Sequence, residues 1–229
     1  MRQKVGNIGV FFVLAFGLSF LANQLPELAF GGFNRKLVLC GCGPLLAGLI
    51  CYRLFRVKNE TGVSLLGEQP VFSVLICAVT LVVFCVTHGG SALAALLVYL
   101  LMQFLYCLGE EFGWRHYLQN ATAWMNEWLQ SFAIGVIWFF WHYSFLGDPQ
   151  EQLLGNAVPA WAFPPVMIVL LTLLSYLFGM MVKRTKSLLF PTVGHVLFKL
   201  DMVTMLVSGC LMAVLLILWK RLPSSRRAD

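Results

Sequence analysis

The stretch that decides the fold runs from residue 91 to residue 118 and reads SALAALLVYLLMQFLYCLGEEFGWRHYL. Residues 91–108 carry no charge, whereas Glu110, Glu111 and Arg115 follow within the next decapeptide, GEEFGWRHYL. The hydrocarbon core of a bilayer is about 30 Å thick, and a helix that crosses it needs ~20 mostly apolar residues. The stretch therefore predicts a membrane-spanning helix with three charged side chains at its carboxyl end.

The composition of the whole chain indicates an integral membrane protein. Of its 229 residues, 59% are hydrophobic and 11% are charged, whereas soluble domains average about 45–50% and ~25%. Long apolar runs without alternation predict helices rather than a closed barrel, the other structure that satisfies the backbone in lipid. We therefore expect one all-α integral membrane domain over residues 1–229, a polytopic bundle of about eight transmembrane helices at 6–25, 37–55, 70–88, 91–109, 129–146, 162–182, 188–200 and 202–219.

The lysines and arginines lie mainly at the ends of these segments and predict the orientation of the chain. Cytoplasmic segments of membrane proteins carry an excess of these residues. The net charge of +6 is not gathered in one patch, so the expected partner is the lipid bilayer and not a nucleic acid. Both termini are expected in the cytoplasm, because that orientation places Arg35, Lys36 and Lys199 outside and twelve residues inside: Arg2, Lys4, Arg53, Arg56, Lys58, Lys183, Arg184, Lys186, Lys220, Arg221, Arg226 and Arg227.

Helical spacing separates the roles of the two glutamates. Glu111 and Arg115 are four residues apart, so they face each other across one helical turn and can form an ion pair. Glu110 lies about 100° further round the helix and is left free in an apolar setting, where it could act as a general base that activates water. The charges alone equally allow a solvated boundary at the end of the span.

Two of the four histidines lie within separate apolar segments. His142 stands in VIWFFWHYSF, within 129–146, and His195 stands in LLFPTVGHVLFKLD, within 188–200. A single histidine in such a place is more often satisfied by a hydrogen bond between helices. Two of them beside an intramembrane carboxylate pair predict a functional site, because ionisable groups within a membrane are costly.

Three motifs in series resemble those of the CPBP family of membrane proteins, which includes type II CAAX prenyl proteases and bacteriocin-processing proteins. EEFGWR at 110–115 matches the EExxxR motif of that family, His142 matches the histidine of FxxxH, and His195 matches the histidine of HxxxN. The resemblance covers roughly residues 70–219, which would carry the protease core.

The resemblance implies an eight-helix bundle around an intramembrane cavity that faces the cytoplasm. Glu110 would activate a water with help from His142, while His195 and the residue at 199 would stabilise the oxyanion; Glu111 and Arg115 would form the supporting pair. The implied activity is that of an intramembrane endopeptidase, similar to CAAX proteases, in the cell membrane of a bacterium. It would hydrolyse a peptide bond near the cytoplasmic face, in a prenylated or membrane-tethered peptide or protein.

Two positions depart from the motifs of the family. Trp138 replaces the usual phenylalanine, and Lys199 replaces the usual asparagine. A protonated lysine could stabilise an oxyanion, or it could pair with Glu110 and neutralise the base. A catalytically inactive member that acts as a scaffold or an immunity-type binding protein is therefore the alternative function. No cofactor is expected, although Glu110, His142 and His195 could instead hold Zn²⁺.

The expected site also constrains the length of the helix over 91–109. His142 lies about thirteen residues into its own span, or ~20 Å from the membrane face where that span begins. Glu110 can meet it only if the helix continues past Arg115 to about Leu118. The charged decapeptide is then expected to lie within the membrane.

Overall fold

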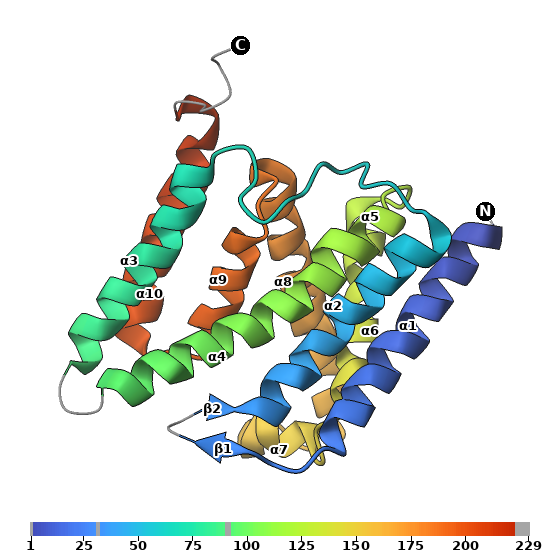
Figure 1. Ribbon diagram of the computed structural model, residues 1–229, viewed down its shortest axis with the longest axis horizontal. Helices are drawn as coiled ribbons and strands as arrows, with labels where there is room; N and C mark the ends of the chain where they lie inside the picture. Colours follow the sequence, from blue (N-terminus) through green and yellow to red (C-terminus); the bar gives the residue numbers. More distant parts are fainter. Residues whose placement is uncertain (1, 31–32, 90–92, 223–229) are drawn as a thin grey trace.

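The computed structural model describes residues 2–30, 33–89 and 93–222 and consists mainly of helices (Figure 1). A short antiparallel hairpin of β1 (Ala29–Phe30) and β2 (Phe33–Asn34) connects the first two helices. The expected all-α class is confirmed. The helices are α1 (Arg2–Asn23), α2 (Arg35–Phe55), α3 (Pro70–His88), α4 (Leu93–Glu111), α5 (Gln119–Ala121), α6 (Glu127–His142), α7 (Pro149–Leu153), α8 (Phe163–Thr185), α9 (Leu189–Leu197) and α10 (Met202–Leu218), with a π-helix η1 (Phe112–Leu118) and 3₁₀ turns η2 (Gly155–Ala157) and η3 (Trp219–Arg221).

Within the described residues, six helical segments are long and apolar enough to cross a membrane. They correspond to six of the eight predicted spans. The chain is therefore a membrane protein, but the expected count of eight is not confirmed. The six segments are Gly6–Asn23, Arg35–Phe55, Pro70–His88, Leu93–Ala121, Phe163–Thr185 and Met202–Arg221.

The other two predicted spans form shorter helices: α9 is largely buried, whereas α6 exposes Trp128, Phe132 and Phe140 at the surface of the bundle. α6 has 16 residues and α9 has 9, which correspond to about 24 Å and about 14 Å of helix. Side-chain caps mark the starts of α6 and of α10, the helix that follows α9. Asn126 accepts a hydrogen bond from the amide of Leu129, and Asp201 accepts from the amides of Val203 and Thr204. Both helices are shorter than the six listed above, so the structure does not confirm them as membrane spans.

The helix that carries the charged decapeptide continues without interruption, as the expected site requires. α4 passes directly into η1 and then into α5, so one helical segment extends from Leu93 to Ala121. The expected extension past Arg115 to Leu118 is confirmed. A π-helical segment is rare and is frequently found at functional sites. Here it follows Glu111 immediately.

Close packing against α2 holds this segment in place. Gly109 and Gly113 form a small-residue pair four positions apart, a spacing that lets membrane helices approach closely. A Cβ atom at Gly109 would meet the backbone of Gly41, and one at Gly113 would meet Pro44. The two glycines flank Glu110 and Glu111, so the depth of both carboxylates depends on this helix–helix contact.

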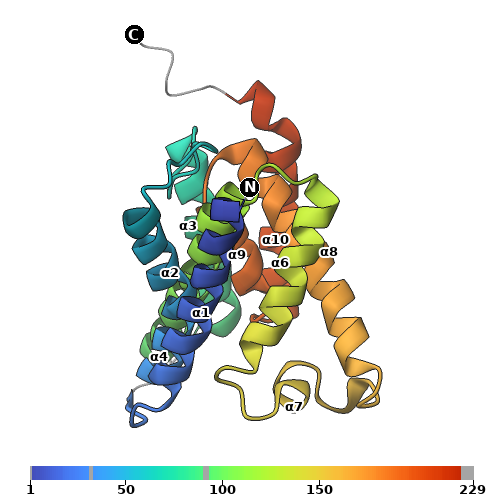
Figure 2. The same cartoon turned by 90° about the vertical axis from the view of Figure 1, so that its right-hand side faces the viewer.

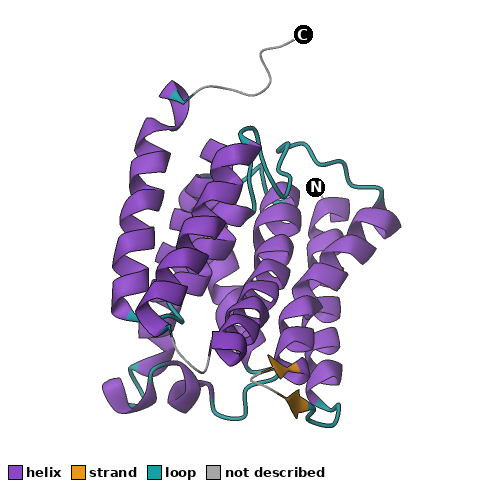
Figure 3. Ribbon diagram, turned by 60° about the vertical axis from the view of Figure 1, so that its left-hand side comes forward, coloured by secondary structure: helices purple, strands orange, loops and turns teal. Residues whose placement is uncertain are grey.

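The bundle has two ends that differ in charge. The start of α1 and the end of α10 lie at one end, here called the terminal end, whereas the β1–β2 hairpin and α7 lie at the other, the hairpin end (Figures 1, 2 and 3). Arg226 and Arg227 lie outside the described residues. Of the other exposed or helix-end bases, Arg35, Lys36 and Lys199 lie at the hairpin end, and ten lie at the terminal end: Arg2, Lys4, Arg53, Arg56, Lys58, Lys183, Arg184, Lys186, Lys220 and Arg221.

Candidate active site

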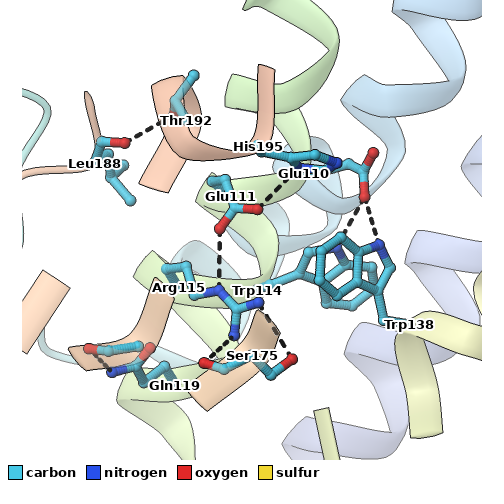
Figure 4. A network of polar contacts seen from close by, with 11 residues as sticks. Glu110, Glu111, Trp114, Arg115, Gln119, Trp138, Ser175, Leu188, Thr192 and His195 are labelled. Atoms are coloured by element: carbon cyan, nitrogen blue, oxygen red, sulfur yellow. Dashed lines mark hydrogen bonds and ion pairs between the residues drawn. The ribbon is translucent and has the colours of Figure 1, made fainter. Parts of the chain in front are cut away.

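Glu110 lies in the last turn of α4 with its carboxylate fully buried. The oxygen Oε2 accepts hydrogen bonds from the indole Nε1 of Trp138 at 2.6 Å and of Trp114 at 3.4 Å (Figure 4). The other oxygen, Oε1, is buried and has no partner among the described residues. Leaving a buried carboxylate oxygen without a hydrogen bond is costly. A water or a polar group of a substrate would remove this cost by donating to Oε1.

Glu111 forms the ion pair that its spacing predicts. Its Oε2 accepts from Nε of Arg115 at 3.0 Å, and both side chains are fully buried. The Arg115 guanidinium also donates to the carbonyl and the hydroxyl of Ser175 in α8, at 3.3 Å each. The rings of Trp138 and Phe178 lie 5.5 and 5.8 Å from its carbon Cζ. Arg115 therefore connects η1 to α6 and α8.

The second oxygen of Glu111 holds His195 of α9. The distance from Oε1 to Nδ1 of the imidazole is 3.1 Å, and Figure 4 shows the ring beside both glutamates. A carboxylate in this position fixes the orientation of a histidine and places the proton on Nδ1. The same histidine lines the cavity. The sequence predicted the pair of Glu111 and Arg115, but not that Glu111 also holds the histidine.

His142 is the last residue of α6, and its imidazole is fixed by its own helix. Nδ1 lies 2.8 Å from the carbonyl oxygen of Trp138. A carbonyl can only accept, so the imidazole donates from Nδ1, and Nε2 is an acceptor in the neutral ring. Trp138 thus holds two site residues, because its indole donates to Glu110 while its carbonyl accepts from His142.

The three candidate catalytic residues line one cavity of about 430 Å³. Glu110, His142 and His195 come from three separate helices, and their shared cavity is what the motif series led us to expect. The rest of the lining is mainly apolar: Leu37, Tyr106, Trp138, Phe145, Leu146, Gln152, Leu153, Leu154, Met167, Leu170, Leu171, Leu174, Phe198 and Lys199.

Lys199 reaches the same cavity from the turn after α9. Its ammonium nitrogen lies 4.5 Å from the centroid of the Tyr106 ring, at cation–π distance. In the part of the chain that the structure describes, no carboxylate forms an ion pair with it. Glu110 and Lys199 therefore share a cavity without neutralising each other directly.

The possible metal ligands are dispersed through the bundle. Over residues 2–30, 33–89 and 93–222, no three His, Cys, Asp or Glu side chains are grouped closely enough to hold a metal ion. The set of Glu110, His142 and His195 therefore does not form a ligand cluster in this conformation. Each of the three nevertheless keeps one polar atom, Oε1 or Nε2, that no other side chain of the site occupies.

Several residues of the site were not predicted. Trp114 stands four residues after Glu110, so the spacing that identified the pair of Glu111 and Arg115 could also have indicated it. Tyr106, one turn before Glu110, carries the same signal. Ser175 lies in a uniformly apolar helix far along the chain, and nothing in the sequence connects it to Arg115.

The two indoles that hold Glu110 permit a matched test. Trp138→Phe replaces the indole with a smaller ring and removes its N–H donor. The lost hydrogen bond to a buried carboxylate oxygen should lower the free energy of unfolding by about 1–3 kcal/mol beyond the effect of the smaller ring. Trp114→Phe trims the same group but removes only the 3.4 Å contact, so its extra loss should be smaller. Chemical unfolding of both variants in detergent micelles measures the difference. Equal losses would mean that packing, and not the hydrogen bond, holds the carboxylate.

Comparison with known families agrees with the site. Residues 92–201 match the family model described as type II CAAX prenyl endopeptidase, Rce1-like. The match confirms the resemblance to the CPBP family and contains every residue of the motif series, from Glu110 to Lys199. No curated protein matches the sequence.

Proposed function

We propose that this chain, whose residues 92–201 carry the type II CAAX prenyl endopeptidase match, hydrolyses peptide bonds within the membrane through a water activated by Glu110. The family supports an intramembrane endopeptidase of the CAAX-protease type. One observation carries the mechanism: Glu110 Oε1 is buried, has no partner among the described residues, and lies in a cavity shared with His142 and His195.

The proposed reaction begins with a water between Glu110 Oε1 and His142 Nε2. Glu110 accepts a proton from this water as its oxygen attacks the carbonyl carbon of the substrate. His195, as an imidazolium that carries a proton on each ring nitrogen, would donate from Nε2 to the developing oxyanion, and so would the Lys199 ammonium. Such donors act most strongly where water is excluded. The proton then passes from Glu110 to the leaving nitrogen as the C–N bond breaks. The products are a new carboxyl group and a new amine.

Glu111 and Arg115 have a supporting part in this proposal. Glu111 holds His195 from the side opposite the cavity, and Arg115 compensates the charge of Glu111. Neither side chain lines the cavity. We propose a metal-free reaction, in which Glu110 and His142 activate the water. Zinc held by Glu110, His142 and His195 is the alternative, because histidines that bind metals also donate their other ring N–H to a carbonyl or carboxylate.

The proposed substrate is a peptide or protein with an apolar segment, such as a prenylated or membrane-tethered chain. Ten of the lining residues are leucine, methionine or phenylalanine, and pockets with such linings bury apolar ligand surface. The lining contains few polar groups, among them Glu110, His142 and His195. The apolar lining would bind the substrate, and the polar residues would position the bond to be cleaved.

We also propose that the chain lies in a bacterial cell membrane with both termini in the cytoplasm. The support is the excess of lysine and arginine at the terminal end, which is the side that such residues keep in the cytoplasm. This placement excludes the cytoplasm-facing cavity that the family resemblance implies. The lining residues that come from helix ends and connections, among them Leu37, Gln152 and Lys199, lie at the hairpin end.

Cleavage by the purified protein tests the proposal. The protein in liposomes is incubated with a library of apolar peptides, and mass spectrometry identifies new termini. We expect cleavage that 1,10-phenanthroline and EDTA leave unchanged. Cleavage that stops with chelator and returns with added Zn²⁺ would support the zinc alternative. Peptide binding without any cleavage would support the alternative function as a scaffold or immunity-type protein.

Lys199 distinguishes the enzyme from a binding protein. If its ammonium donates to the oxyanion, Lys199→Ala should lower the rate of cleavage by about 10²–10³-fold. Lys199→Asn supplies a neutral donor of the kind usual at this position and should keep most of the activity. Steady-state rates for the same peptide compare the three proteins. Cleavage by Lys199→Ala at the native rate would remove Lys199 from the mechanism.

A further inference from the structure

Connections at only one end of the bundle contribute to the lining of the cavity. They are the start of α2, the chain between α6 and α7, α7 itself and the turn after α9, as Leu37, Leu146, Gln152 and Lys199 show. All of these segments lie at the hairpin end (Figures 1 and 2). No residue of the connections at the terminal end lines the cavity. A polypeptide that reaches Glu110 must therefore enter from the hairpin end or from the lipid beside it.

The charges assign opposite sides of the membrane to the two ends. Ten described lysines and arginines lie at the terminal end and three at the hairpin end, all in helix ends or short connections where the bias toward the cytoplasm operates. The hairpin end also carries four acidic residues, whose weaker influence on orientation does not oppose this assignment. They are Glu27, Asp148, Glu151 and Asp201.

Exposed aromatic side chains at both ends are consistent with a bilayer between them. Trp124 and Trp128 are 52% and 57% exposed near the connection of α5 to α6, at the terminal end. Tyr143 and Trp161 are 50% and 82% exposed on either side of α7, at the hairpin end. Tryptophan and tyrosine are enriched at the two membrane–water interfaces. The direction from the terminal end to the hairpin end therefore follows the membrane normal.

We infer that the cavity opens on the face of the membrane away from the cytoplasm. If the proposed endopeptidase function holds, on which this step rests, the substrates are exported polypeptides or extracytoplasmic segments of membrane-anchored ones. A prenylated chain terminus in the cytoplasm would meet the terminal end, where no residue leads into the cavity. The apolar lining suits a segment that enters from the outer leaflet.

Epitope accessibility tests the orientation without reference to activity. One variant carries an epitope after Gly155, between α7 and α8, and its matched control carries the epitope after Gly62. Both glycines have a positive φ, at 55° and 67°, and an added Cβ would meet no atom at either. We expect an antibody to bind the Gly155 epitope on intact spheroplasts and the Gly62 epitope only after lysis. The reverse pattern would overturn the inference.

Vesicles of defined orientation test the access of substrate. Peptides with charged, membrane-impermeant tails are added to right-side-out and to inverted vesicles that contain the untagged protein. Cleavage by right-side-out vesicles is expected, and cleavage by inverted vesicles alone would contradict the inference. If neither preparation cleaves, even after solubilisation, the endopeptidase proposal fails, while the epitope result still decides the orientation.

Discussion

Glu110→Gln is expected to lower the rate of peptide hydrolysis by about 10²–10⁴-fold, the contribution of a general base. The amide has nearly the same shape, and its oxygen can still accept from Trp138, while its nitrogen replaces Oε1 at the cavity. The side chain then cannot accept the proton of the attacking water. Initial rates with one cleaved peptide, compared with the native protein, measure the loss.

The fold should survive this change, so the yield of folded protein should stay at the native level while the rate of hydrolysis falls. Glu127→Gln is a suitable control, because Glu127 is a half-exposed carboxylate that pairs with Lys183 at the bundle surface. It should cleave at the native rate, and both variants should elute as folded protein after detergent extraction. A Glu110→Gln protein that folds and retains native activity would show that another group activates the water.

Arg115→Ala is expected to lower the free energy of unfolding by about 3–5 kcal/mol, the usual cost of leaving a buried charge without its partner. The substitution leaves Glu111 fully buried with only His195 to compensate it. It also removes the donors to the Ser175 carbonyl and hydroxyl. Since membrane domains are marginally stable, a large loss of folded protein should accompany the shift. Chemical unfolding in micelles and the folded yield measure it.

Lys183→Ala is the matched control, because it breaks an ion pair whose side chains are 39% and 47% exposed. An exposed pair contributes about 0–1 kcal/mol, so this variant should remain close to the native stability. An Arg115→Ala protein that folds normally but has lost activity would mean that the roles of the two glutamates are exchanged.

The long helices could be predicted from the sequence, and the two shortest spans could not. A run of ~20 apolar residues has few alternatives to a membrane helix, and this held for the six segments identified by length. α6 and α9 have the apolar composition of spans but are shorter than the other six helices, and composition does not show where a helix ends. Their lengths are set by Asn126, Asp201 and the surrounding contacts, which composition does not reveal.

The candidate site was predictable where its contacts are local. The pair of Glu111 and Arg115 follows from spacing along one helix, and the structure confirms it. Contacts between helices left no such signal: Trp138 with Glu110, and Glu111 with His195, join residues 28 and 84 positions apart. The replacement of phenylalanine by Trp138 looks conservative in sequence, yet it supplies an N–H donor that phenylalanine lacks.

The orientation shows how two predictions can conflict once a structure relates them. Charge predicts cytoplasmic termini, and the family resemblance implies a cytoplasm-facing cavity. In the sequence these statements are independent. In the structure, connections of the hairpin end line the cavity, opposite the start of α1 and the end of α10, so the charge pattern and the family resemblance favour different orientations in the membrane.

A single turnover in H₂¹⁸O tests the central claim most directly, because it follows the oxygen of the attacking water. The protein, in excess over a cleavable peptide, is quenched after one cycle, and both are analysed by mass spectrometry. If Glu110 acts as a general base, one ¹⁸O is found in the new carboxyl terminus of the product and none in the Glu110 side chain. Label in Glu110, or the absence of any cleaved peptide, would contradict the account.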